Sequence, residues 1–429
     1  MIPRRVLLGS GVGLALACFA LARVQNLVQA AGLFLALFGV AFACYAAALW
    51  AVSRPGGQPM LLVVLVAAGV FRLILLWTPP TLSTDAYRYV WDARVASAGI
   101  SPYAEAPTAP EVAHLRDATI FPRLNHPTWR TVYPPGAQLF FRAVYAVRPD
   151  SVLAMKVALA IGEIATLIVL ASLLRALGLP LRQLTVYAWN PLVLVEIWGS
   201  GHLDALAVLS VVAAVRLRVA DRTGAAAAVL GLGTLVKLYP AALLPLLLRG
   251  AGAGPLVTFA LVIALGYAPF IHLGIGVLGS LSHYVTAEFF NPGLLRAVVD
   301  VPAVSMVALL AWVVGASLLG GAVPLIARIV ALIGGFVLLS PNVFPWYVLW
   351  LVPFLAVRPS AAWIAFTGTV ALAYTFFVHE PWSIPVWARA AQVAPLVLGA
   401  GWAMGRNILA KRTLADVSLM SPPVRGGRQ

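Results

Sequence analysis

Long apolar stretches recur along almost the whole of this chain, and they restrict its fold more than any other feature. The hydrocarbon core of a bilayer needs about 20 apolar residues per helix, and several of these stretches approach or exceed that length. Only 10% of the 429 residues are charged, whereas a soluble domain carries about 25%. Because lipid offers the backbone no hydrogen-bond partners, the sequence predicts an α-helical bundle in a membrane.

The net charge of +15 would indicate nucleic-acid binding in a soluble protein. Here the arginines fall mostly in short turns between apolar stretches, which is the bias of cytoplasmic loops. We therefore expect the lipid bilayer, and no nucleic acid, as a partner. Arg4 and Arg5 place the N-terminus in the cytoplasm. Cys18 and Cys44 lie within apolar stretches, so neither a disulfide framework nor a metal cluster is indicated.

The order of apolar stretches and basic turns predicts an all-α, multi-pass protein of the inner membrane with about 12 transmembrane helices. Four regions are expected: transmembrane helices in 1–78, a large external loop with interfacial helices in 79–150, a bundle in 151–405 containing a second external loop (274–302), and a disordered basic cytoplasmic tail in 406–429. The expected spans lie near 6–22, 28–52, 59–78, 151–174, 184–199, 203–219, 255–273, 303–319, 323–340, 343–357, 360–378 and 386–405.

Residues 224–248 admit two interpretations. The stretch is long enough to span once, but Lys237-Leu238-Tyr239-Pro240 interrupts it. A single span would place Arg249 outside and invert everything that follows. Two half-helices that return to the cytoplasmic face keep Arg249 inside, together with Arg358 and Arg406, and broken helices are tolerated where protein buries them. The sequence favours the half-helix pair.

Polar residues other than the arginine anchors gather on the predicted external side, and ionisable groups near a bundle interior indicate a functional site. Residues 83–99 are predicted to form an interfacial helix that Ser83 or Thr84 caps and Gly99 ends. Its spacing puts Asp85, Arg88, Tyr89 and Asp92 on one face. This face suits a base, a substrate-orienting group and a phosphate contact. The alternative is structural: Asp85 complements the helix dipole and Arg88 pairs with Asp92.

The remaining candidates come from several polar turns. Proline-held turns present Arg123, His126 and Tyr133, while Gly-Ser-Gly precedes His202 and Asp204, which alternatively cap the next helix. Lys237 is a lipid-phosphate contact or a lysine that snorkels to the interface. The further candidates for substrate binding are Glu288 and Asn291 in the second loop and Tyr347, which alternatively serves as an aromatic membrane anchor.

Several motifs resemble bacterial GT-C glycosyltransferases, in particular the actinobacterial-type polyprenyl-phosphomannose-dependent mannosyltransferases. These motifs are Thr84-Asp85-Ala86-Tyr87-Arg88-Tyr89-Val90-Trp91-Asp92, Gly99-Ile100-Ser101-Pro102-Tyr103, Asn125-His126-Pro127, Tyr133-Pro134-Pro135, Ala188-Trp189-Asn190-Pro191-Leu192, Gly201-His202-Leu203-Asp204, Lys237-Leu238-Tyr239-Pro240 and Pro345-Trp346-Tyr347. They occur in the order of the family and span about residues 80–350. The resemblance implies a GT-C-like bundle with its active site in the first large external loop.

The resemblance implies that Asp85 is the catalytic base or a substrate anchor, and we expect it to be the base. The implied donor is a hexose, expected to be mannose, on a polyprenyl phosphate. Many relatives carry two adjacent acidic residues here, whereas Thr84 precedes Asp85 in this chain. Because one carboxylate binds a divalent cation poorly, we expect no metal and no other cofactor. The chain also has no glycine-rich nucleotide loop. The expected function is transfer of the hexose to a lipid or glycan acceptor on the non-cytoplasmic face, and the alternative is a transporter or lipid-linked sugar flippase.

Overall fold

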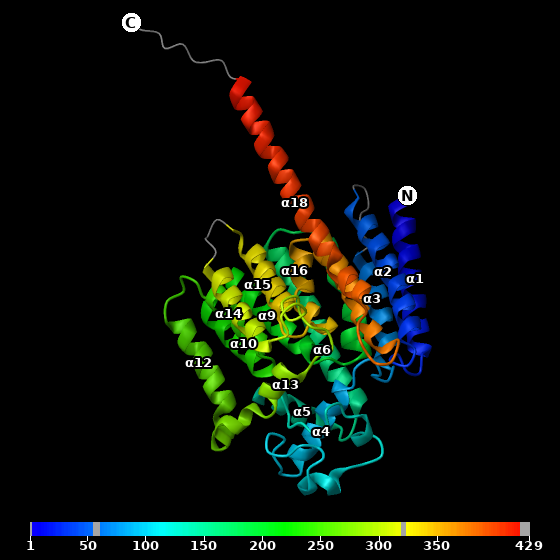
Figure 1. The fold of residues 1–429 in the computed structure, drawn as a ribbon, viewed down its shortest axis with the longest axis vertical. Helices are drawn as coiled ribbons and strands as arrows, with labels where there is room; N and C mark the ends of the chain where they lie inside the picture. The colour runs from blue at the N-terminus through cyan, green and yellow to red at the C-terminus, as the bar shows by residue number, and fades with distance from the viewer. Residues whose placement is uncertain (1, 55–60, 319–322, 421–429) are drawn as a thin grey trace.

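The computed structural model describes residues 2–54, 61–318 and 323–420, and every regular element in these ranges is helical. The first three helices are α1 (Ile2–Arg23), α2 (Ala31–Ser53) and α3 (Leu61–Leu76), which run side by side along one flank of the bundle (Figure 1). Their bounds agree with the expected spans. Their outward faces carry large exposed apolar side chains such as Leu16 and Leu62, as lipid contact requires.

The first loop (residues 79–135) lies at one end of the bundle together with α4 (Asp85–Ser97) and α5 (Pro135–Val147), opposite the end from which α18 (Val386–Met420) projects (Figure 1). Both short helices were expected from the sequence. After α4, the loop contains two 3₁₀ turns, η1 (Pro110–Leu115) and η2 (Phe121–Arg123). Arg94 holds it in place, because its guanidinium contacts Asp117 and Asp150 at 2.9 and 2.7 Å.

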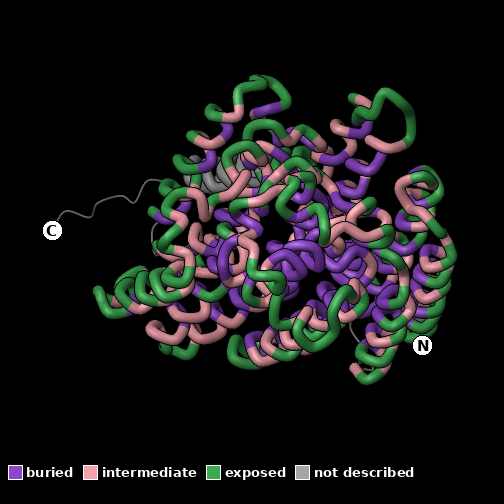
Figure 2. The backbone as a smooth tube through the Cα atoms, turned by 90° about the horizontal axis from the view of Figure 1, so that it is seen from below, coloured by how far each residue is buried: buried purple, intermediate pink, exposed green. Residues whose placement is uncertain are grey.

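The centre of the bundle consists of α6 (Val152–Ala176), α9 (Asp204–Val219) and α10 (Thr223–Val236). The side chain of Ser151 caps α6 by accepting a hydrogen bond from Ala154 N. Figure 2 shows buried segments gathered in the middle, surrounded by exposed helices. Charge buried between α3 and α6 is paired: the Arg72 guanidinium on α3 forms two hydrogen bonds, of 2.6 and 2.9 Å, with Glu163 on α6.

Residues 224–248 fold back on themselves. Helix α10 ends at Val236, and the chain returns through η5 (Tyr239–Leu243) and α11 (Leu244–Leu247). Leu247 comes back to the end of α9, where its carbonyl accepts a hydrogen bond from Arg218 at 2.9 Å. Meanwhile Lys237, at the turn, contacts Asp204 at the other end of α9. This is the geometry of the half-helix pair, and Arg249 follows on the Arg218 side.

Two expected spans are broken helices instead. Residues 184–199 divide into η3 (Leu181–Leu184), α7 (Thr185–Ala188), α8 (Pro191–Val193) and a π-helix, η4 (Leu194–Gly199). Pro191 has no N–H to continue the preceding turn, and the Asn190 side chain instead accepts from Leu192 N. Residues 343–357 likewise divide into η7 (Pro345–Trp350) and α16 (Val352–Val357), at Pro345 and Pro353.

The rest of the bundle consists of α12 (Gly254–Tyr267), η6 (Ala268–Leu278), α13 (Leu281–Ala287), α14 (Pro302–Leu318), α15 (Leu325–Leu339), α17 (Ala361–Thr369), η8 (Val370–Phe377) and α18. The second loop therefore contains a helix, α13. Helix α18 continues to Met420, through part of the tail predicted to be disordered, whereas residues 421–429 lie outside the described residues.

Four helical segments in the described part of the chain are long and apolar enough to cross a membrane, with further apolar helices that are shorter. The segments are Pro3–Arg23, Ala31–Ser53, Val152–Ala176 and Gly254–Ala287. The chain is thus an all-helical membrane protein by length and composition. The larger number of about 12 spans stays a prediction.

Candidate active site

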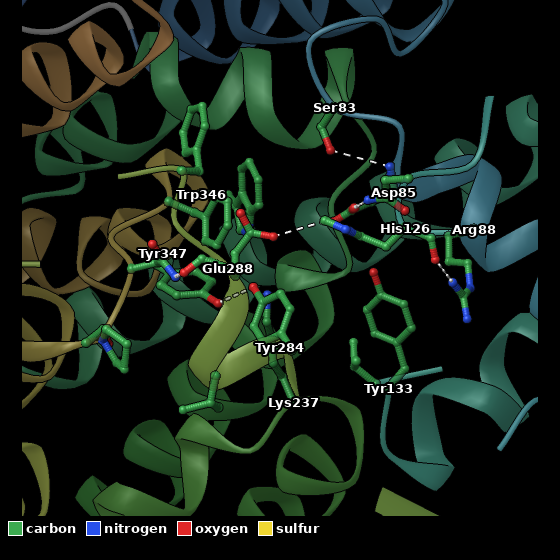
Figure 3. A pocket seen from close by; sticks show the side chains of 18 of the residues that line it. Ser83, Asp85, Arg88, His126, Tyr133, Lys237, Tyr284, Glu288, Trp346 and Tyr347 are labelled. Carbon is green, nitrogen blue, oxygen red and sulfur yellow. Dashed lines mark hydrogen bonds and ion pairs between the residues drawn. The ribbon is translucent and has the colours of Figure 1, made fainter. Parts of the chain in front are cut away.

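Asp85 is the first residue of α4, where its carboxylate is favoured by the helix dipole. Its Oδ1 accepts a hydrogen bond of 2.6 Å from the Asn125 amide, and its Oδ2 lies 3.5 Å from His202 Nδ1. Its side chain is 16% exposed, into a cavity of about 850 Å³. Figure 3 shows the carboxylate among the other polar groups of this cavity. Asn125 and His202 therefore contact the Asp85 carboxylate on one side, and its other side faces the cavity.

The pKa of Asp85 is set by opposing effects. Burial raises it, but the nearby His202 imidazole, the charge of Lys237 and the Asn125 hydrogen bond outweigh the burial. The pKa of this carboxyl consequently lies below its ordinary value, and the group is ionised at neutral pH. An ionised, partly accessible carboxylate can accept a proton from a hydroxyl group that enters the cavity.

His202 lies behind Asp85 and has no exposed surface. Its Nε2 is 3.2 Å from Glu196 Oε2, so that two carboxylates flank one imidazole. The ring also stacks on Trp346, with centroids 4.0 Å apart. Burial lowers the pKa of the imidazole, but Asp85 and Glu196 raise it to about 9. His202 is a cation at neutral pH.

Seven of the residues predicted from the sequence line this one cavity: Asp85, Arg88, His126, Tyr133, Lys237, Glu288 and Tyr347. They come from α4, the first loop, the turn after α10, the second loop and η7, and Figure 3 shows them around a common space. Much of the remaining wall is aromatic, including Trp129, Phe290, Phe344, Trp350, Phe376 and Trp382. The cavity therefore combines a small charged region with a large apolar one.

Lys237 supplies a cation to the cavity. Its ammonium contacts Asp204 Oδ2 at 2.6 Å and lies 5.1 Å from the centre of the Tyr347 ring. Asp204 is buried, and its second oxygen accepts from Trp350 Nε1 at 2.6 Å. Asp204 thus lies behind Lys237 rather than in the cavity wall, and it orients the ammonium group.

Arg88 pairs with Asp92, which is the structural alternative that the sequence offered for these two residues. Its Nε donates to Asp92 at 2.8 Å, and its Nη2 donates to the Trp129 carbonyl at 2.9 Å. Asp92 is buried and also accepts from Gln138 at 3.0 Å. This pair ties α4 to the first loop and α5, and Asp92 does not line the cavity.

His126 and Glu288 join the two loops across the cavity. The imidazole Nε2 lies 3.0 Å from Glu288 Oε2, and the ring stacks on Trp129 at 4.0 Å. His126 has a φ of 45°, which is rare for a residue with a side chain and is found at functional sites. Close by, the hydroxyls of Tyr284 and Tyr347 lie 2.8 Å apart. The second loop therefore forms part of the site.

Three further predicted residues lie away from the cavity. Tyr89 is buried, and its hydroxyl accepts from Leu203 N at 3.2 Å. Asn291 is also buried, where its amide donates to the Val343 carbonyl at 2.7 Å. Arg123 is exposed and bonds to the carbonyl of Thr119 within its own loop. None of the three lines the cavity, and their assignment as substrate contacts stays a prediction.

Several residues of the site were not singled out from the sequence. Asn125 was noticed only as part of a motif, although it bonds directly to Asp85. Glu196 lay inside an apolar stretch, where a lone carboxylate was itself a signal for a buried partner. Trp346 was likewise noticed only within the motif Pro345-Trp346-Tyr347, and Tyr284 carried no signal, since aromatic residues are common at membrane interfaces.

Within the described ranges, no group of three or more His, Cys, Asp or Glu side chains is arranged to hold a metal ion. The absence of a metal or other cofactor stays a prediction, argued from the single acidic residue at position 85.

A family model described as alpha-(1->6)-mannopyranosyltransferase, N-terminal domain, matches residues 9–250, which is more than half of the chain. The chain belongs to this family. The match confirms the resemblance to actinobacterial-type GT-C mannosyltransferases, and it includes Asp85, His202 and Lys237. Comparison with curated proteins and with solved structures gave no match. Membership of the alpha-(1->6)-mannopyranosyltransferase family supports a membrane-bound mannosyltransferase.

Proposed function

We propose that this mannopyranosyltransferase-family protein transfers mannose from a polyprenyl phosphate to a lipid or glycan acceptor on the non-cytoplasmic face of the inner membrane. Asp85 is the base in this proposal. The observation that carries it is the cavity of about 850 Å³, where the ionised Asp85 and Lys237 line the same space as an aromatic wall. A donor with a charged phosphate and a long apolar chain needs both kinds of surface.

In the proposed reaction, Asp85 accepts the proton of an acceptor hydroxyl as the hydroxyl oxygen attacks the anomeric carbon. The bond between that carbon and the phosphate oxygen breaks, and polyprenyl phosphate leaves with its electron pair. The growing negative charge on phosphate needs a nearby cation. Lys237 is the best placed, because its ammonium lines the cavity and uses its hydrogen bond to Asp204 for orientation.

Several of the predicted substrate contacts fit this reaction. His126, Tyr133, Glu288 and Tyr347 line the cavity and present hydroxyl, imidazole or carboxylate groups that can bind sugar hydroxyls. Arg88 also lines it, but its guanidinium is engaged by Asp92 and the Trp129 carbonyl. We therefore assign Arg88 to the positioning of the loop rather than to the phosphate.

The topology that accompanies this proposal has both termini in the cytoplasm and the first loop outside. The arrangement of the bundle supports it, since the N-terminus and the free end of α18 lie at the end opposite α4 and α5 (Figure 1). A donor carried by the membrane also explains why a site on that face needs no cytoplasmic nucleotide sugar.

Replacement of Asp85 by Asn tests the proposal. The purified chain in proteoliposomes is supplied with polyprenyl-phosphate mannose and membrane acceptors, and transfer of the sugar is measured. Loss of the base should slow transfer by about 10²–10⁴-fold. The matched control is Asp221→Asn, since Asp221 is 92% exposed at a turn and its side chain forms an exposed ion pair. Full transfer by Asp85→Asn, at normal protein levels, would refute the role of Asp85.

The alternative, a transporter or flippase of lipid-linked sugars, draws support from one feature, the interrupted helix pair around Lys237. It requires movement of substrate across the bilayer without formation of a glycosidic bond. Uptake of labelled substrate by the same proteoliposomes, with no glycosylated product, would favour it over transfer.

A further inference from the structure

A row of buried polar side chains runs from Asp85 behind the cavity wall to Tyr374, which again lines the cavity. His202 follows Asp85, Glu196 follows His202 at 3.2 Å, and the Tyr374 hydroxyl donates to Glu196 Oε1 at 2.8 Å. Glu196 and His202 are almost fully enclosed, with exposures of 1% and 0%. Neither lines the cavity, so neither can contact a sugar in it.

The backbone around Glu196 is built to bring these side chains together. Residues Leu194–Gly199 form a π-helix, a wide turn that is rare and often found at functional sites. The amide of His202 donates to the Glu196 carbonyl at 3.1 Å, and Gly201 takes a φ of 76° to close the turn. The chain therefore turns back on itself so that the carboxylate and the imidazole lie side by side.

The charges around His202 explain why it is retained in a closed space. A buried carboxylate is costly unless a cation pairs with it. Glu196 on η4 and Asp85 on α4 both face the imidazole, while η7 contributes the uncharged ring of Trp346.

The other ionisable groups near His202 have partners of their own. Lys237 pairs with Asp204, whereas the ammonium of Lys156 on α6 donates to the Thr78 carbonyl at 2.5 Å. Tyr89 on α4 accepts from the backbone at Leu203, and Tyr374 on η8 bonds to Glu196. The cation that faces both Glu196 and Asp85 is thus His202.

We propose that His202, as an imidazolium supported by Glu196, is a positioning residue that keeps Asp85 ionised and directed into the cavity. The inference rests on the proposed function, because it explains how the base of that reaction is held. It replaces the sequence-based assignment of His202 as a substrate contact. It also gives Glu196 a role at a distance from the reacting atoms.

Glu196→Gln tests this proposal with little change in shape. In the wild type we expect transfer to fall as pH rises through about 9, where His202 loses its proton and no longer directs the Asp85 carboxylate, which itself stays ionised at that pH. Removal of an adjacent negative charge lowers the pKa of an imidazole by about 1–3 pH units, so the alkaline limb of the kcat–pH profile should move to lower pH by that amount. KM for the polyprenyl-phosphate donor should stay unchanged. A merely structural role would lower transfer equally at every pH.

The matched control is Glu163→Gln, which neutralises another fully buried carboxylate that is paired with Arg72 instead of His202. Its alkaline limb should stay at the wild-type pH, measured on equal amounts of folded protein. If Asp85→Asn inactivates the protein but the alkaline limb of Glu196→Gln stays at the wild-type pH, the positioning role of His202 is wrong and the proposed function is not affected. Full activity of Asp85→Asn overturns the proposed function as well.

A second measurement does not depend on turnover. Infrared difference spectroscopy against pH reads protonation of carboxyl groups directly. The double variant His202→Gln with Glu196→Gln removes the buried cation together with one of its counter-ions, and Asp85 should then take up its proton at a higher pH than in the wild type. If the Asp85 carboxyl titrates at the same pH in both proteins, the proposal is wrong.

Discussion

Replacement of Gly201 by alanine probes how tightly the turn before His202 is packed. Gly201 has a φ of 76°, a conformation that costs a residue with a side chain about 1–2 kcal/mol. A Cβ atom there would also lie 2.9 Å from Lys156 Cγ and 3.4 Å from Ala86 Cβ. Overpacking of this kind costs about 1–3 kcal/mol. We therefore expect Gly201→Ala to lower the free energy of unfolding by about 2–5 kcal/mol.

The packing cost depends on whether Lys156 can move aside. Its ammonium donates to the carbonyls of Thr78 and Leu75, at 2.5 and 3.4 Å, so the side chain is fixed at its far end. Any shift must break these bonds or move the Gly201 turn, and movement of the turn displaces His202 from Asp85. Gly201→Ala should therefore reduce the transfer rate as well as stability.

Gly178→Ala is the matched control, because Gly178 has a φ of 67° and a Cβ atom there would meet no neighbour within 4 Å. The free energy of unfolding of Gly178→Ala should fall only by the cost of a positive φ for alanine, about 1–2 kcal/mol. The assay is reversible unfolding in mixed micelles with an increasing fraction of denaturing detergent. Addition of Lys156→Ala should recover part of the loss in Gly201→Ala but none in Gly178→Ala. Equal losses for the two glycine variants would refute the reasoning.

Two further predictions concern the ion pairs of the site. Since the pKa of His202 is raised to about 9, the stability that its charge contributes should be complete below its ordinary pKa of 6.5 and disappear as pH rises through 9, by about 1.4 kcal/mol per pH unit. Thermal unfolding at a series of pH values should show this decline. A His202→Gln protein that declines equally would contradict it. Arg88→Met leaves Asp92 buried without its cation and should cost about 3–5 kcal/mol, which unfolding measurements should show to be partly recovered by a second change, Asp92→Leu.

The sequence predicted the long helices well, because length and apolarity are local properties. Helices α1, α2 and α6 begin and end within a few residues of the expected bounds. It missed the breaks in 184–199 and 343–357. Those breaks depend on how Pro191, Pro345 and Pro353 are accommodated, and an apolar stretch does not reveal whether its neighbours will satisfy the freed backbone groups.

For the site, the sequence identified polar residues but not their partners. Asp85 and Lys237 were found because charged residues are conspicuous in an apolar chain. The pair His126 with Glu288 joins two separate loops, and the pair His202 with Glu196 depends on a π-helix and the turn after it, so no spacing rule predicts either pair. Asp204 was assigned to substrate because nothing in the sequence showed that Lys237 already holds it, whereas the pairing of Asp92 with Arg88 was the structural alternative that their spacing offered.

These pairings limit which side chains of the cavity can bind a phosphate. Arg88 is engaged by Asp92, and His202 is enclosed between two carboxylates, so neither presents an uncommitted charge to the cavity. Lys237 is different, because an ammonium has three N–H groups and its hydrogen bond to Asp204 uses one of them. The ammonium also lies beside the Tyr347 ring, in the wall of the cavity. In the proposed function, a phosphate that binds Lys237 would therefore lie beside the Tyr347 ring.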